Sequence, residues 1–201
     1  MSARAVALPG IAAALVGGVL AVQVAYGGGS FEPLRPRAPC AARTVVSQSE
    51  GIEALTERLV LIAVDRAACR LDVSREAFLL DVAGPGVRSD AEVDALRAAL
   101  HDAVAQMKAD DTLPPASDLV DEALDAASLN GLLEAVIRAL PDSAIDAALR
   151  TDDVLDRAID DLDLRALLAD LDDQDELEAR VEVAVSAAVT DSLVARVRDL
   201  I

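Results

Sequence analysis

Apolar residues recur every three or four positions along most of the chain after residue 46, the pattern of helices with one buried face. This pattern predicts a first helix from Ser47 or Ser49 to Cys69, a brief second helix over residues 75–82 and a third that begins after Ser89. We expect residues 47–109 to form a three-helix unit around one core. The inward-facing positions are Ile52, Leu55, Leu59 and Ile62, then Phe78, Leu79 and Val82, then Val93, Leu96, Leu100, Val104 and Met107.

The starts of the second and third helices carry local signals of their own. Ser74 is a favourable N-cap residue, because its hydroxyl accepts from a free backbone N–H of the first turn. Ser89 and Glu92 form the S-x-x-E pattern of a capping box. Between them, residues 84–86 read Gly-Pro-Gly and end the second helix.

The second half of the chain is an acidic region of short helices, expected over residues 116–201. Aspartates recur at spacings of 10, 11 and 10, with apolar pairs between them, so each repeat resembles an acidic N-cap followed by one or two helical turns. The aspartates are Asp142, Asp152, Asp163 and Asp173. Residues 161–168 resemble tandem Leu-Asp-Leu short-helix arrays of membrane-associated proteins from high-GC bacteria, a resemblance that implies no chemistry. The last segment, from residue 172 to 201, is expected to be one long helix.

The N-terminus predicts a membrane segment. Residues 5–26 carry no charge, and a helix of about 20 residues crosses a bilayer core of ~30 Å. We expect a single-pass transmembrane anchor there, with residues 1–4 as a short cytoplasmic tail. A cleaved signal peptide remains an alternative, because Ala25 and Gly27 place small residues where a signal peptidase cuts.

The orientation of the anchor is set by opposing signals. Arg35, Arg37 and Arg43 follow the apolar run, and a count of positive charge would keep that side in the cytoplasm. The very short N-terminal tail is instead typical of an exported signal-anchor. We expect the cell membrane as the location, with the remainder of the chain extracytoplasmic.

The two cysteines favour export as well. Residues 27–46 are rich in Gly and Pro and predict an extended linker. Cys40 lies in this linker and Cys69 ends the first helix, and they are the only cysteines. A lone pair in an exported domain most simply forms one disulfide, and closing its loop is worth about 3–4 kcal/mol by chain-entropy arithmetic.

Charge and composition exclude several classes of function. The net charge is −18, and residues 101–201 hold 25 acids against 8 bases, which argues against nucleic-acid binding. With one tyrosine, two phenylalanines and no tryptophan, the chain lacks aromatic platforms for bases or sugars. His101 is expected to be a surface residue, and the acidic clusters around residues 160–163 and 172–176 to be helix caps and solvated faces. We therefore predict no catalytic residue, no metal site and no cofactor.

The sequence thus predicts an all-α protein: a transmembrane helix, a Pro-rich linker, a three-helix unit, an array of short helices and a long C-terminal helix. Its expected role is non-catalytic, an interaction or structural module at the cell envelope that meets the membrane through residues 5–26 and binds a protein partner. The sequence leaves open whether the protein binds a small molecule. The alternative is a membrane-anchored adaptor or regulatory protein whose acidic part faces the cytoplasm with reduced cysteines.

Overall fold

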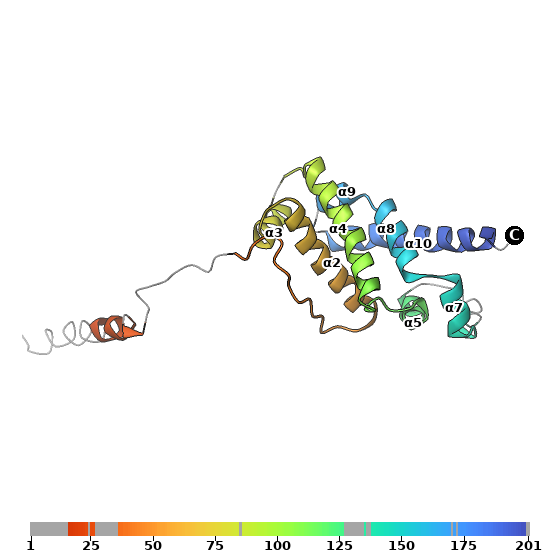
Figure 1. Ribbon diagram of the computed structural model, residues 1–201, viewed down its shortest axis with the longest axis horizontal. Helices are drawn as coiled ribbons and strands as arrows, with labels where there is room; N and C mark the ends of the chain where they lie inside the picture. The colour runs from red at the N-terminus through yellow and green to blue at the C-terminus, as the bar shows by residue number, and fades with distance from the viewer. Residues whose placement is uncertain are drawn as a thin grey trace, which may run out of the picture. The chain divides into compact units, whose positions relative to one another are not determined.

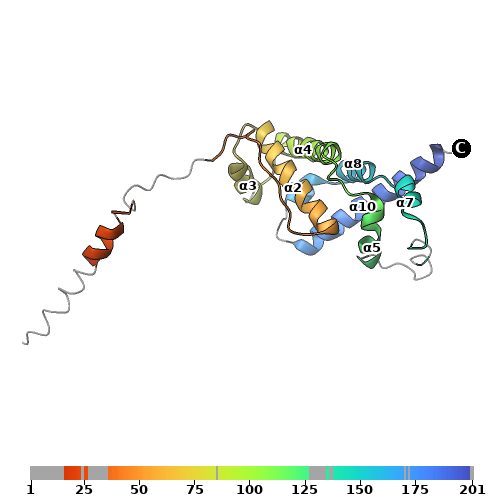
Figure 2. The ribbon, with the colours of Figure 1, turned by 60° about the horizontal axis from the view of Figure 1, so that its bottom comes forward.

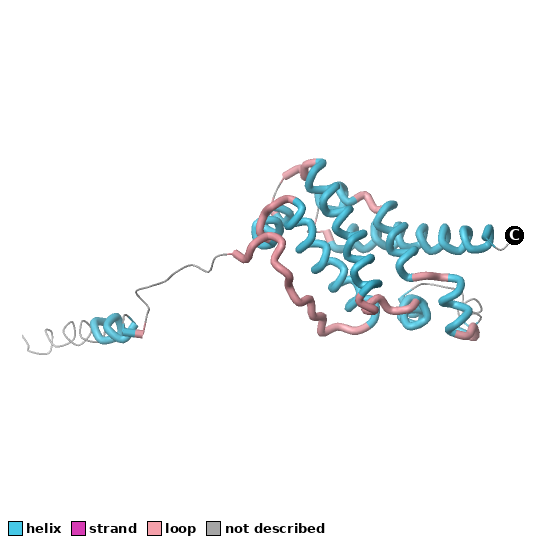
Figure 3. Tube along the Cα trace, viewed as in Figure 1, coloured by secondary structure: helices cyan, strands magenta, loops and turns pink. Residues whose placement is uncertain are grey.

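The structure, a computed structural model, describes residues 16–23, 25–26, 36–84, 86–126, 135, 138–169, 171 and 173–199. Over these residues the backbone forms helices and loops without a strand, which confirms the all-α prediction (Figure 3). The chain divides into two compact units, Met1–Pro36 and Arg37–Ile201.

In the first unit, residues 16–23 are helical and their side chains are exposed. None of the helices that the structure describes combines the length and the apolar character needed to cross a membrane. The predicted span of residues 5–26 lies partly outside the described residues, and the predicted tail of residues 1–4 lies outside them entirely.

Two long helices, α2 (Gly51–Arg70) and α4 (Asp90–Ala109), pack side by side in the second unit (Figures 1 and 2). Between them in sequence, α3 (Arg75–Ala83) packs against α2. The later helices are α5 (Ala116–Ala126), α7 (Asp142–Ala148), α8 (Thr151–Asp161), α9 (Leu164–Ala169) and α10 (Gln174–Asp199).

Alanines bring α2 and α4 together. Four of them, Ala63 and Ala67 on α2 and Ala99 and Ala103 on α4, have no exposed surface, so the two backbones approach closely. Larger apolar side chains fill the space around them. The predicted inward positions other than Ile52 and Leu79 belong to this core or pack against it. Its larger buried members include Leu55, Leu59, Ile62, Phe78, Val93, Leu100, Val104 and Met107.

The predicted caps are present. The Ser74 hydroxyl accepts from the backbone N–H of Ala77 at 3.1 Å and opens α3. At the start of α4, Ser89 and Glu92 complete the capping box, and the Glu92 carboxylate accepts from the Ser89 backbone at 2.6 Å. A hydrogen bond from the neighbouring Asp81, together with those from Ser89, lowers the pKa of Glu92 to about 2.

Residues 37–50 form an extended strap along α2. The strap alternates between half-buried and exposed positions, and Val45 packs against the core. Eleven extended residues from Cys40 to Glu50 reach about as far as the twenty helical residues of α2, roughly 30–35 Å in both cases. Gly51, at φ +60°, turns the strap into the helix. Residues 37–46 of the expected linker are therefore part of the folded unit.

A disulfide between Cys40 and Cys69 fastens the other end of the strap, which confirms the predicted pairing. The two Cα atoms are 4.7 Å apart. Near it, the Arg43 side chain, only 9% exposed, pairs with Glu76 at 3.0 Å and with Asp65 at 3.6 Å. The strap is thus joined to both α2 and α3.

The three-helix region and the acidic region share one core. Ile159 of α8 and Leu164 of α9 are buried in the same cluster as α2 and α4. Arg97 of α4 donates to three carbonyl oxygens at the C-terminal end of α8, those of Ile159, Asp160 and Leu162. A cation is favourable at this end of a helix, because unpaired carbonyls give it a partial negative charge.

The repeating aspartates do not all act as caps, which corrects that part of the repeat prediction. Asp163 and Asp173 accept from backbone N–H groups at the starts of α9 and α10, each at 3.0 Å. Asp142 instead lies one residue after the N-cap of α7. Asp152 is the second residue of α8, and its carboxylate binds the side chains of Lys108 and Arg150. One further position differs from prediction: Leu79 is not buried with Phe78 but is 45% exposed.

Candidate functional site

A group of polar side chains lies where α8 meets α10 in the second unit. α10 contacts α8 through a stripe of small side chains spaced four residues apart, Ala184, Ala188 and Ser192, all buried. Small residues on one face let two helices pack closely. The close contact along this stripe brings Ser192, Ala195 and Arg196 of α10 next to α8.

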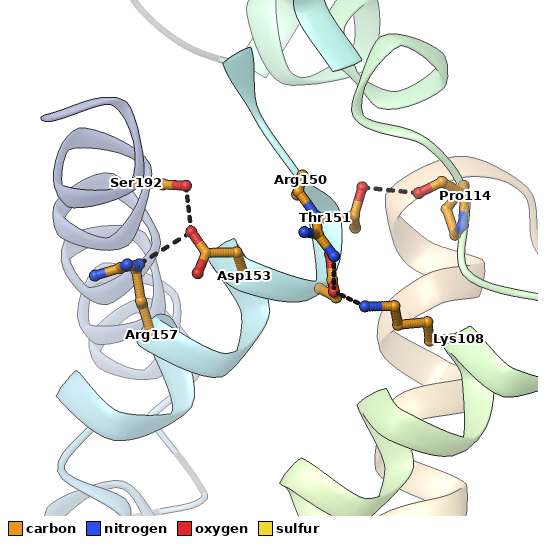
Figure 4. Close-up of polar contacts among 8 residues, drawn as sticks. Lys108, Pro114, Arg150, Thr151, Asp153, Arg157 and Ser192 are labelled. Atoms are coloured by element: carbon orange, nitrogen blue, oxygen red, sulfur yellow. Dashed lines mark hydrogen bonds and ion pairs between the residues drawn. The ribbon is translucent and has the colours of Figure 1, made fainter. Parts of the chain in front are cut away.

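Asp153 of α8 is the centre of the contact (Figure 4). The Ser192 hydroxyl donates to the Asp153 carboxylate at 2.6 Å, and Nε of Arg157 donates to the same oxygen at 3.1 Å. Both hydrogen bonds stabilise the carboxylate and lower the pKa of Asp153, and the positive charge of Arg196 adds to the effect.

The neighbouring Asp152 points the other way, toward α4. Its carboxylate binds Lys108 of α4 and lies 2.9 Å from Nη2 of Arg150. Burial acts to raise the pKa of Asp152, but the two cations outweigh it and the pKa is lowered. The Thr151 hydroxyl donates to the carbonyl oxygen of Pro114 at 2.8 Å, so the first turn of α8 is fixed on two sides (Figure 4).

Side chains of α8 and α10 line a cleft of about 280 Å³, named here the α8–α10 cleft. Three arginines and three aspartates are among its lining residues. Its lining residues are Arg150, Asp152, Asp153, Asp156, Arg157, Ser192, Ala195 and Arg196.

His101 of α4 contacts Asp156, one of the residues that line the cleft. Its ring nitrogens contact Asp156 at 2.8 Å and Asp160 at 3.1 Å, and its side chain is half-buried. The expectation of a lone surface histidine is therefore wrong, because α8 packs its acidic edge directly onto this part of α4.

The cleft does not activate Ser192 as a nucleophile. A catalytic serine needs a base that takes its proton. The hydrogen-bond partner of Ser192 is Asp153, whose carboxylate is already held ionised by Arg157 and is therefore a weak base. Among the residues that the structure describes, no group of three or more His, Cys, Asp or Glu side chains is arranged to hold a metal ion. The polar groups of the cleft join α10 to α8.

Sequence reasoning missed Asp153, Arg157 and Ser192. Asp153 and Arg157 are an i, i+4 pair, which alone is typical of any exposed helix. The better signal was the spacing of Ala184, Ala188 and Ser192, which marks a close helix contact.

Large apolar side chains of α10 lie outside this contact. Val183 is 70% exposed, and Val181, Val185, Leu193 and Val194 are each exposed by more than a third. Burying an alanine removes less apolar surface from water than burying a valine. α10 therefore buries its smaller side chains in this structure and leaves its larger ones in solvent.

No family model, curated protein or solved structure matches this chain.

Proposed function

We propose that this chain is a non-catalytic interaction module of the cell envelope, anchored in the membrane by residues 5–26 with its helical unit outside the cytoplasm. Its docking element is α10, and its partner is a protein that presents a basic amphipathic helix. The observation that carries the proposal is the exposure of the valines of α10.

The exposed residues of α10 include a continuous face. Val183, Ala187, Thr190 and Val194 follow each other at spacings of four, three and four, so they lie on one side of the helix. All four are exposed. We name them the α10 face. Such a 3–4 spacing is the one that a second helix covers in a coiled-coil contact.

Charge favours a basic partner. Residues 101–201 carry a net charge of −17, from 25 acids and 8 bases. On α10 itself, Glu182 and Asp191 are exposed on the two sides of the α10 face. A basic helix is attracted by this field, whereas a second copy of the chain, at −18, is repelled.

The disulfide supports a location outside the cytoplasm. Structural disulfides persist in oxidising compartments and are rare in cytosolic proteins. Here Cys40–Cys69 closes the strap against α2.

Site-specific photo-crosslinking in the full chain, expressed in its own host, tests the proposal. A photoreactive amino acid replaces Val183 on the α10 face, and the matched control replaces Val46 of the strap, which is also 70% exposed. We expect an adduct at position 183 and not at position 46, and mass spectrometry identifies a basic amphipathic helix in the crosslinked peptide.

Two results would overturn the assignment of α10. One is equal crosslinking at positions 183 and 46, and the other is an adduct between two copies of α10. A second variant makes the test independent of the crosslinker: Val194→Asp on the α10 face abolishes the adduct at 183, whereas Val46→Asp leaves it unchanged.

A further inference from the structure

A second set of exposed apolar side chains lies on α3 and just after it, at the end of the folded unit opposite the C-terminal end of α10 (Figures 1 and 2). Leu80 is 76% exposed, Val87 is 91% exposed, and Leu79 joins them at 45%. α3 buries Phe78 against α2, so this nine-residue helix has apolar side chains on both its inner and outer sides. We name Leu79, Leu80 and Val87 the α3 patch.

The α3 patch lies at the end where the chain enters the unit. Cys40 is bonded to Cys69, the residue before the last of α2, and α3 begins only five residues after α2 ends. α3 lies at this end, and the C-terminal end of α10 points away from it in both views (Figures 1 and 2). The chain from residues 1–36 therefore enters the folded unit at its α3 end.

We infer that the α3 patch seats on the lipid bilayer that carries the anchor of this same chain, and that α10 then faces away from the membrane. The inference rests on the proposed anchoring of residues 5–26. Thirteen residues lie between Tyr26 and Cys40, a tether that spans at most about 50 Å when fully extended. A tether this short makes seating an intramolecular step, so modest apolar contact suffices for it.

The distribution of charge favours the same orientation. Residues 1–100 hold 11 acids and 10 bases, whereas residues 101–201 have a net charge of −17. An anionic bilayer surface repels the acidic region and leaves the nearly neutral α3 end toward the lipid.

The charged residues of α3 are partnered within the protein and do not oppose the contact. Glu76 pairs with Arg43 at 3.0 Å. Arg75 lies 3.5 Å from Asp65. Asp81 is hydrogen-bonded to Glu92, whose neighbouring carboxylate raises the pKa of Asp81.

The absence of tryptophan from the natural sequence provides a clean test. The full chain carrying Leu80→Trp is reconstituted into vesicles of phosphatidylcholine and phosphatidylglycerol, with and without brominated phosphatidylcholine, which quenches tryptophan on contact. The matched control is Val183→Trp, at an equally exposed apolar position of α10. Flotation of the vesicles measures anchoring separately.

We expect both variants to float with the vesicles. Emission from position 80 is then blue-shifted and several-fold weaker with brominated lipid, while emission from position 183 is unchanged. Addition of Leu79→Asp and Val87→Asp to Leu80→Trp restores its emission, and circular dichroism checks that the exposed substitutions leave the fold intact. If the protein floats with the vesicles while positions 80 and 183 are quenched equally, the contact of the α3 patch with the bilayer is ruled out, but the anchoring by residues 5–26 is not. If the protein does not float, both the anchoring and the contact of the α3 patch with the bilayer are ruled out.

Discussion

Ser192 of α10 donates its hydroxyl to Asp153 of α8 at 2.6 Å, and Ser192 has no exposed surface. Because Ala184 and Ala188 continue the same stripe, this hydrogen bond is the polar centre of a contact otherwise made by small apolar groups. The relationship fixes which side of α10 faces the body of the protein, and therefore which side carries the α10 face.

Ser192→Ala tests that contact. The substitution keeps the small stripe and removes the donor that the buried Ser192 gives to the half-buried carboxylate of Asp153, so we expect a loss of about 1 kcal/mol in the free energy of unfolding. The control is Ser186→Ala at an exposed position of the same helix, which leaves stability unchanged. Chemical denaturation followed by circular dichroism measures both. Equal effects of the two variants would contradict the role of Ser192.

Acid weakens the same contact. The pKa of Asp153 in the folded protein is below its ordinary value of 3.8, so the folded state binds fewer protons than the unfolded chain near that pH. The stabilisation is present above the unfolded value and is lost as the pH falls through the lowered one. Unfolding free energy measured between about pH 6 and about pH 3 therefore declines toward acid. Asp153→Asn removes part of that decline. If the variant kept the same slope of unfolding free energy against pH, Asp153 would not be a source of the pH dependence.

Among the contacts of the strap, we expect the disulfide to contribute most to the free energy of unfolding. Chain-entropy arithmetic for the loop from Cys40 to Cys69 gives about 3–4 kcal/mol, so reduction lowers the denaturation midpoint of the oxidised protein markedly. The double variant Cys40→Ser with Cys69→Ser has the lowered midpoint from the start and does not respond to reductant. A midpoint that reductant leaves unchanged in the natural protein, with free thiols verified, would show that the strap is held by its other contacts.

Arg97 connects the two halves of the folded unit. Arg97→Leu leaves the carbonyls at the end of α8 without their donor, and we expect a loss of about 2–3 kcal/mol. The control is Arg180→Leu, because Arg180 makes an exposed i, i+4 pair with Glu176 that contributes little. Equilibrium unfolding compares the two variants. If Arg180→Leu cost as much as Arg97→Leu, the role assigned to Arg97 would be wrong.

Local signals were read correctly from the sequence. Ser74 and the capping box of Ser89 and Glu92 act within one helical turn, so no knowledge of distant contacts is needed to place them. The cysteine pairing followed because Cys40 and Cys69 have no other partner in the chain.

Features that depend on tertiary packing were not predictable in the same way. The strap looked like a linker because its half-buried positions are Ala41, Arg43, Val45, Ser47 and Ser49, which lack the apolar alternation of a buried extended segment. Leu79 lies beside Phe78 in an apolar run, and only the direction from which α2 packs on α3 decides that Phe78 is buried and Leu79 is not. The contact of His101 with two aspartates likewise depends on where α8 packs on α4.

The buried and exposed sides of α10 were not predictable from the sequence either. Val181, Val183 and Val185 alternate, and valines occur on almost every side of the helix, so its periodicity does not identify a buried face. The alanines make the intramolecular contact because they allow α8 to approach. Val181, Val183, Val185 and Val194 stay exposed.

The most direct test of the central claim, that the folded unit works outside the cytoplasm, is a topology measurement. Alkaline phosphatase and a fluorescent protein are each fused after Ile201 and expressed in bacterial cells. We predict phosphatase activity without fluorescence, which places residues 37–201 in the compartment where Cys40 and Cys69 are oxidised. Fluorescence without phosphatase activity would contradict the account, because Arg35, Arg37 and Arg43 would then lie in the cytoplasm and the acidic region would meet cytoplasmic partners.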